Sequence, residues 1–108
     1  MINLQQMILA YLPFFNVVAA ESAINPMALL QLSYEITQGN LKLLKNNNFF
    51  AIKPKLAKDF HKYPTIFDGI NAGIEKLKSH PDFSKNKIGT LKANQSLQYQ
   101  KLKGLIKL

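Results

Sequence analysis

One segment of the sequence, residues 25–39, carries a complete set of signals for where a helix begins and ends. Asn25 is a favoured N-cap residue, and Pro26 fits the first helical position, where its missing N–H costs nothing. Apolar residues follow at helical spacing up to Ile36. Gly39 predicts the end of the helix, because glycine readily adopts the left-handed conformation found after helix C-termini. Any fold of this chain must therefore accommodate a helix that begins at Pro26 and ends before Gly39.

Helical patterns account for most of the remaining chain, and the signal for strands is poor throughout. Pro13 either kinks the first helix or begins a second one. Asn40 can cap a short helix at 41–45. Thr65 predicts another N-cap, with Asp68 three residues later close to a capping box. Gly69 and Gly73, four residues apart, would let a neighbouring helix come close. We therefore predict a mainly α fold. The other helical segments expected are 2–12, 41–45, 65–80 and 96–108, with a helical turn or two at 55–62 and an extended segment or buried turn at 49–52.

The composition narrows the class of protein. At 108 residues there is room for one domain, which we place at 1–108, and the hydrophobic share of 47% is ample for a core. Because cysteine is absent, neither disulfides nor thiolate metal sites are available. His61 and His80 lie far apart in the sequence without clustered carboxylates. We therefore predict no metal and no cofactor, and we expect a monomer.

All 14 basic residues are lysines, and the formal net charge is +8. The absence of arginine excludes the bidentate contacts with guanine by which many proteins read DNA sequence, so no specific nucleic acid is expected as a partner. Lysines still favour loose attraction to polyanions such as teichoic acids, anionic lipid or the acidic peptide stems of a cell wall. A weak contact with an anionic membrane surface is compatible with this charge, although charge alone selects no function.

The apolar N-terminus, residues 1–20, has no basic residue ahead of its apolar stretch, and Pro13 interrupts it. We therefore expect a core helix here and no signal peptide or membrane span, in a protein made in the cytoplasm. An amphipathic contact with a membrane stays compatible with this segment.

Glu35 stands out among the six acidic residues because it falls in the last turn of the predicted helix 26–38. On a helical wheel it shares a stripe with Ala28, Gln31 and Leu32, which is not an obviously solvated face. The negative end of the helix dipole and apolar neighbours would both favour the protonated carboxyl. A carboxyl group that keeps its proton is what general acid catalysis of glycoside cleavage requires. The alternative is an ordinary surface glutamate near a helix end.

The residues around Glu35 resemble a family signature. The sequence Glu-Ile-Thr-Gln-Gly at 35–39 is followed by Asn-Asn-Phe-Phe-Ala-Ile-Lys at 47–53. This order resembles the glucosaminidase family of peptidoglycan hydrolases, which includes the flagellar muramidases and belongs to the lysozyme-like superfamily. In that family a helix ends in Glu-Ser-Gly-Trp-Gly, and Asn-Asn-Leu-Phe-Gly-Ile-Lys follows about a dozen residues later. The resemblance implies that Glu35 is the catalytic acid.

The resemblance extends over residues 24–108 in the right order. The stretch 60–66 is similar to the family's Phe-x-x-Tyr-x-Ser segment, and it likewise leads into a helix. That helix is followed by His-Pro-Asp-Phe at 80–83, similar to the family's Asn-Pro-x-Tyr, and residues 99–102 resemble the closing helix. The resemblance implies a small lysozyme-like helical domain.

Three departures from the family pattern limit what carries over. The residues after Glu35 lack the family's Ser-Gly-Trp, and only residues 54–62 stand where members carry a β-hairpin lobe, so that lobe is largely missing. The family's Gly-Tyr-Ala-Thr-Asp-Pro segment has no match, the nearest stretch being 92–95. Tyr63 has the best position to replace its tyrosine, although a core aromatic is the alternative. As second carboxylate we favour Asp59, because Asp68 is expected to cap a helix.

The resemblance implies cleavage of peptidoglycan glycan strands at the cell wall or in the periplasm, by either hydrolysis or transglycosylation, and such a short form would suit a phage lytic or virion-associated enzyme. We expect the asparagine run to shape a substrate groove. The alternative is that the run forms a turn and that the aromatic residues after it belong to the core. A catalytically degenerate wall binder or virion structural protein, and a basic nucleic-acid or membrane-surface module, also stay open. The residues expected to contact substrate are Gln31, Asn47, Asn48, Phe49 and Phe50.

Overall fold

The computed structural model describes residues 1–22 and 24–79, and it is mainly helical, as predicted. Four helices follow one another: α1 (Leu4–Glu21), α2 (Pro26–Thr37), α3 (Leu41–Lys45) and α4 (Ile66–Lys78). The predictions made for residues 80–83, 92–95, 96–108 and 99–102 lie outside the described residues.

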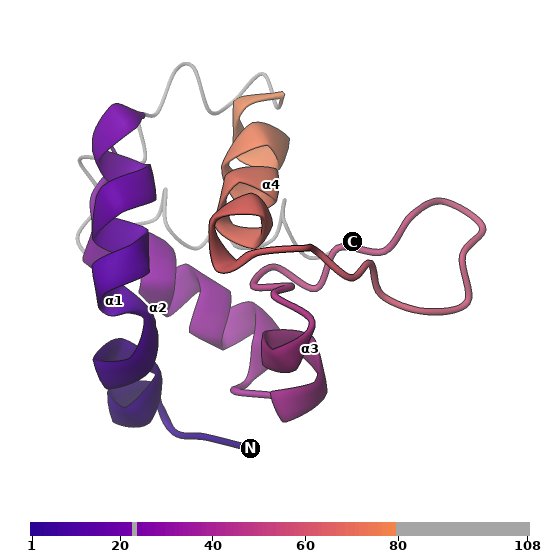
Figure 1. Ribbon diagram of the computed structural model, residues 1–108, viewed down its shortest axis with the longest axis horizontal. Coiled ribbons are helices and arrows are strands. Elements are labelled where there is room, and N and C mark those ends of the chain that lie inside the picture. The colour runs from indigo at the N-terminus through magenta and orange to yellow at the C-terminus, as the bar shows by residue number, and fades with distance from the viewer. Residues whose placement is uncertain (23, 80–108) are drawn as a thin grey trace.

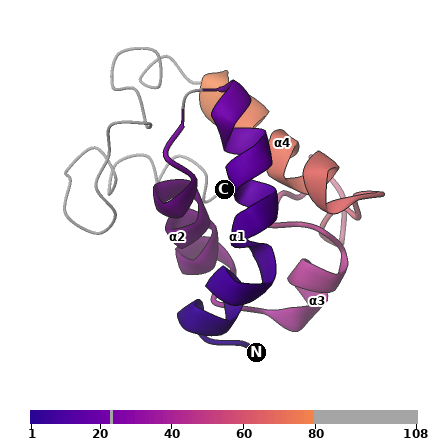
Figure 2. The ribbon, with the colours of Figure 1, turned by 60° about the vertical axis from the view of Figure 1, so that its left-hand side comes forward.

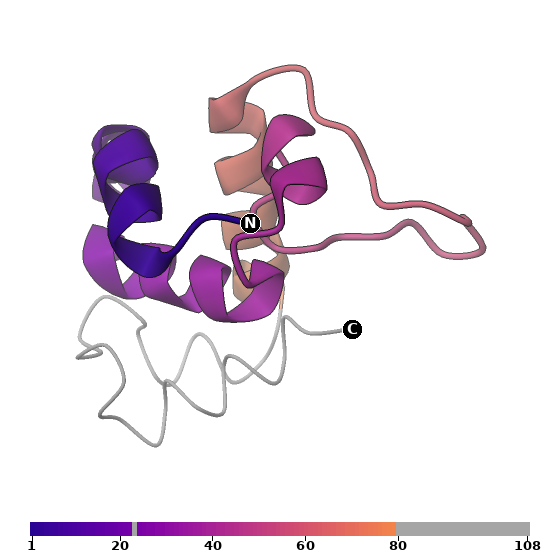
Figure 3. The ribbon, with the colours of Figure 1, turned by 90° about the horizontal axis from the view of Figure 1, so that it is seen from below.

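The helices form one body from which a long loop projects. Helix α1 lies between α2 and α4 (Figure 2), and it packs against both. The short α3 follows the end of α2, and the chain then runs through an irregular segment to the start of α4 (Figure 1). Within that segment, residues 53–62 extend away from the helices, which is seen most clearly from below (Figure 3). We call residues 53–62 the lysine loop.

Of the two alternatives for Pro13, the structure shows no second helix, because Pro13 lies inside one continuous helix, α1. Its start is fixed by a capping box: the Gln6 N–H donates to Asn3 Oδ1 (2.8 Å), and the Asn3 N–H donates to Gln6 Oε1 (2.9 Å). No single helix in the described ranges is long and apolar enough to cross a membrane. Helices α1 and α2 together have the length and apolar composition of a membrane span, but the chain bends by 120° between them.

Helix α2 begins as predicted and ends slightly differently. Asn25 Oδ1 accepts the N–H groups of Met27 (3.0 Å) and Ala28 (3.1 Å). The left-handed C-cap is Gln38, with φ 54°, and Gly39 follows in the same region with φ 70°. Gly39 is needed for a second reason, since a Cβ there would overlap the Ile2 carbonyl, while the Ile2 N–H donates to the Gly39 carbonyl at 3.1 Å. The N-terminal segment is thereby joined to the end of α2.

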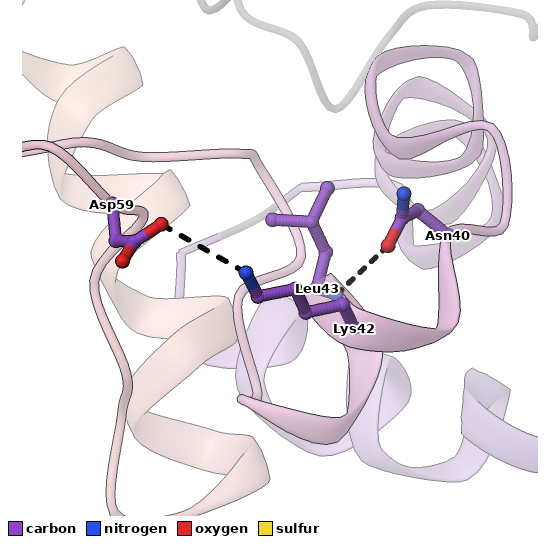
Figure 4. A network of polar contacts seen from close by, with 4 residues as sticks. All are labelled: Asn40, Lys42, Leu43 and Asp59. Carbon is purple, nitrogen blue, oxygen red and sulfur yellow. Dashed lines mark hydrogen bonds and ion pairs between the residues drawn. The ribbon is translucent and has the colours of Figure 1, made fainter.

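The N-caps of α3 and α4 are the predicted residues. Asn40 Oδ1 accepts the Leu43 N–H (3.2 Å) at the start of α3, as Figure 4 shows. Thr65 Oγ1 accepts the Asp68 N–H (3.1 Å) at the start of α4 and donates to Asp68 Oδ2 (3.0 Å). The prediction of helical turns at 55–62 is wrong, because this segment consists of turns and bends whose ends are tied to the asparagine run.

The core lies where α1, α2 and α4 meet the turn at residues 47–52. Phe15 of α1 packs edge-on against Phe49 (ring centroids 5.6 Å apart) and tilted against Phe50 (6.4 Å). These rings join side chains from all three long helices. The largest fully buried side chains are Met7, Phe15, Leu29, Leu30, Leu32, Phe49, Phe50, Ile70, Ile74 and Leu77.

Gly69 and Gly73 do allow a close approach, but the close neighbour is the turn at 47–50 and not a helix. A Cβ at Gly69 would overlap the Asn47 carbonyl, and a Cβ at Gly73 would overlap the Phe50 ring. The two glycines therefore form the surface of α4 on which the turn rests.

Replacing Gly73 with alanine tests this contact. We expect Gly73→Ala to lower the free energy of unfolding by about 1–3 kcal/mol, because the added methyl group overpacks the core against Phe50. The measurement is urea denaturation followed by circular dichroism. Asn71→Ala, at an exposed position of the same helix, is the control and should leave stability unchanged or raise it by about 0.5 kcal/mol. Equal denaturation midpoints for Gly73→Ala and wild type would contradict the packing described.

Candidate functional site

Glu35 lies in the last turn of α2, two residues before its end at Thr37. It is partly buried, whereas the other four acidic residues in the described ranges are exposed. The last turn of α2 contains no basic residue, and the Gln38 side-chain amide donates to the Glu35 backbone carbonyl at 2.7 Å. The carboxylate therefore stands near the negative end of a helix dipole, in a position that is neither fully solvated nor enclosed.

Three other acids in the described ranges have identifiable polar partners. Asp68 caps α4 through Thr65. Asp59, the predicted second carboxylate, is exposed on the lysine loop and forms an ion pair with Lys42 of α3 at 3.8 Å (Figure 4). Glu75 lies 4.0 Å from Lys78 on α4. Asp59 is therefore positioned by a lysine and by its loop.

Asn48 is fully buried, and its side chain is occupied by the backbone. Its Nδ2 donates to the carbonyls of Ile52 (2.8 Å) and His61 (2.9 Å), and its Oδ1 accepts the Ile52 N–H (2.9 Å). The His61 N–H also donates to the Ile52 carbonyl at 3.0 Å, which closes the base of the lysine loop. Both amide hydrogens of Asn48 are thereby used, so the predicted contact with a sugar is not available to this side chain in the structure.

Asn47, the preceding residue, has a similar structural role. Its φ of 57° is in the left-handed region, which asparagine tolerates better than most residues. Its Nδ2 donates to the Tyr63 carbonyl (3.0 Å), and the Tyr63 N–H donates to the Asn46 carbonyl (2.9 Å). The asparagine run thus fixes the chain on both sides of the lysine loop.

Phe49 and Phe50 are fully buried, so the prediction that they stack on substrate is not met in this conformation. The Phe49 ring packs edge-on against Tyr11 (5.1 Å) as well as Phe15, and its carbonyl accepts a hydrogen bond from the Ser33 hydroxyl of α2. The two rings are core aromatics, the alternative that the sequence left open. Their burial explains why an apolar pair follows the asparagines.

Glu35 and the contact of α2 with Phe49 lie on different faces of the helix. Ser33, buried against the turn, and Glu35 are two residues apart, which is about 200° around a helix. Glu35 therefore leaves α2 on the side away from Phe49, with Gln31 one turn earlier on the same stripe. Gln31 is partly buried, as Glu35 is. Of the predicted site residues, the structure places Gln31 beside Glu35, whereas Phe49 contacts the opposite face of α2.

Tyr63 is held by its backbone, and its ring lies edge-on against the His61 ring, with centroids 4.4 Å apart. Partial burial raises the pKa of Tyr63 above its usual value of 10.0, because desolvation disfavours the phenolate. Tyr63 is therefore a neutral phenol at physiological pH. No group of three or more potential metal ligands (His, Cys, Asp or Glu) occurs within residues 1–22 and 24–79.

Two structural residues were not predicted from the sequence. Ser33 stands among apolar residues in α2, and a lone hydroxyl on such a face is a signal for a buried hydrogen bond. His61, considered only as a metal ligand, contributes its backbone to the base of the lysine loop. Comparisons with known protein families, curated proteins and solved structures give no match to this chain.

Exchanging the Asn48 amide for a carboxylate tests its role. We expect Asn48→Asp to lower the free energy of unfolding by about 2–4 kcal/mol, because a charged carboxylate replaces a buried amide and two carbonyls lose their donor and face an acceptor. Urea denaturation at neutral pH measures the loss. Asn71→Asp on the exposed face of α4 is the matched control, with an expected change within about 0.5 kcal/mol. If both variants unfold at the same urea concentration, the amide of Asn48 has no such role.

Proposed function

We propose that this chain cleaves the glycan strands of peptidoglycan, with Glu35 as the general acid. The observation that carries the proposal is the partial burial of Glu35 at the end of α2, which no other acidic residue in the described ranges shares. The ordered resemblance to the glucosaminidase family puts the catalytic glutamate at the same residue. Glycoside cleavage needs a carboxyl group that delivers a proton to the leaving oxygen, and the end of α2 carries such a group.

In the proposed reaction Glu35 acts largely alone. Its carboxyl group donates a proton to the oxygen that links two amino sugars, the C1–O bond breaks, and positive charge develops on the sugar ring. A water molecule then attacks C1 and returns its proton to Glu35, or a hydroxyl group of the same sugar does so in a transglycosylation. The acetamido group of the sugar is a further internal nucleophile, which water would later displace. None of these routes requires a metal or a cofactor.

The contacts of Asp59 support a mechanism with one acid. A second carboxylate would have to lie about 5–9.5 Å from the first, across the scissile bond. Asp59 is paired with Lys42 on the lysine loop, where its negative charge already has a partner. Tyr63, a neutral phenol, is suited to hydrogen bonding but not to replacing a carboxylate.

A catalytically degenerate wall binder is the second candidate. The observation that favours it is that Asn48, Phe49 and Phe50 are fully buried and do not line a substrate surface. Such a protein would bind the wall and release no fragments. Either protein would act at the cell wall or in the periplasm.

Replacing Glu35 with glutamine tests the proposal. We expect Glu35→Gln to reduce the release of soluble muropeptides from purified peptidoglycan at least ~100-fold, because the amide cannot donate the catalytic proton. Mass spectrometry of the products measures this release, and it distinguishes reducing ends from anhydro ends. Circular dichroism should show an unchanged fold.

Glu75→Gln is the matched control, because Glu75 lies in the last turn of α4 as Glu35 does in α2, but is exposed. It should release muropeptides at the wild-type rate. Undiminished release by Glu35→Gln would exclude Glu35 as the acid. Wall binding by the wild type with no released fragments would establish the degenerate binder instead.

A further inference from the structure

The lysine loop projects from a fixed base. Its ends are held together by the Asn48 amide and by the bond from the His61 N–H to the Ile52 carbonyl. Beyond the loop, Tyr63 is fixed by the asparagine run through its own N–H and carbonyl. The loop therefore projects from the helical body in a defined direction (Figures 1 and 3).

Leu56 near the middle of this loop combines two unfavourable features. Its side chain is 99% exposed, and its φ of 70° is in the left-handed region that leucine rarely adopts. The neighbouring backbone forms a turn, in which the Ala57 N–H donates to the Pro54 carbonyl at 3.0 Å. A large apolar side chain held in a strained conformation and directed into solvent gives the fold no packing in return. A contact outside the chain would account for both features.

Positive charge surrounds Leu56. The loop contains four lysines and one acid, Asp59, which gives it a net charge of +3 with His61 neutral. Asp59 is paired with Lys42 of α3 (Figure 4), so a fifth lysine stands beside it. A second apolar side chain, Phe60, is 43% exposed. The exposed lysines of the loop are Lys53, Lys55, Lys58 and Lys62.

We propose that the lysine loop docks this protein on an anionic lipid bilayer, with Leu56 entering the apolar layer and the lysines contacting the headgroups. A bilayer offers negative charge and an apolar phase within a few ångströms of each other, which matches a leucine surrounded by lysines. A soluble polyanion such as teichoic acid or nucleic acid would engage the lysines and leave Leu56 in water. The proposal does not depend on glycan cleavage, because binding is measured without peptidoglycan.

A tryptophan reporter tests the insertion directly, because the chain contains no tryptophan. The probe is a vesicle of equal parts phosphatidylglycerol and phosphatidylcholine, compared with phosphatidylcholine alone. We expect the fluorescence of Leu56→Trp to shift to shorter wavelength on the anionic vesicles and to be quenched by lipids with brominated acyl chains. Leu9→Trp is the control: Leu9 is 77% exposed on α1, the helix on the far side of the body from the loop (Figure 1), and its emission should not shift.

Binding affinity provides a second test with variants that preserve the loop. Leu56→Asn suits the left-handed backbone and should weaken binding to the anionic vesicles about tenfold, through loss of apolar burial. Lys55→Gln and Lys58→Gln should each weaken it about fivefold, because each lysine near an anionic surface contributes that much. The matched controls, Leu9→Gln on α1 and Lys78→Gln on α4, should bind as the wild type does.

The proposal is overturned if the wild type fails to bind anionic vesicles, or if Leu56→Asn binds as tightly as the wild type. Loss of binding in the lysine variants alone would mean that the loop holds polyanions by charge, without insertion into lipid. Equal losses in Leu56→Asn and Leu9→Gln would place the contact elsewhere on the surface.

Discussion

A single buried amide, that of Asn48, joins segments of the chain that have no helix or strand to hold them. It bonds the backbone of Ile52 and of His61, and so it closes the lysine loop at its base. The turn that results directs Phe49 and Phe50 into the core, where Ser33 of α2 binds the Phe49 carbonyl. Gly69 and Gly73 then let α4 rest on the same turn. Without this amide, α2, α4 and the loop would lose their common point of contact.

Glu35 and the contact that holds the turn at 47–52 lie on different faces of α2. Phe49, directly after the asparagine run, is held on one face of α2 through Ser33, while Glu35 and Gln31 lie on another. A motif of asparagines and aromatics can therefore be required for the fold alone, through a buried amide and two core rings. Of the residues on which the resemblance to the glucosaminidase family rests, 47–53 form a supporting turn in this chain, and Glu35 is the proposed acid. The lysine loop adds a basic surface that projects from the helices (Figure 3).

The sequence predicted the features that depend on neighbours in the chain. Asn25, Asn40 and Thr65 were identified as N-caps because a cap bonds backbone groups two or three residues away. The partial burial of Glu35 also followed from its helical stripe.

What depends on distant contacts was not predictable in the same way. An apolar pair after a turn has the same sequence pattern whether it enters a core or lines a groove. Phe49 and Phe50 were therefore expected to contact substrate. A helical turn or two was expected at residues 55–62, because nothing local indicates that Asn48 holds the ends of the loop together. The partner of Gly69 and Gly73 was taken to be a helix, since a sequence shows the space that glycine leaves but not what fills it.

Amide hydrogen exchange measured by NMR tests the role of Asn48 most directly. The Ile52 N–H donates to Asn48 Oδ1, and the His61 N–H donates to the Ile52 carbonyl. Within the described residues, the backbone N–H groups of Lys58 and Asp59 have no backbone acceptor. The structure predicts slow exchange at Ile52 and His61, on the timescale of the helical amides, and rapid exchange at Lys58 and Asp59. Exchange at Ile52 and His61 as fast as at Lys58 and Asp59 would contradict the account.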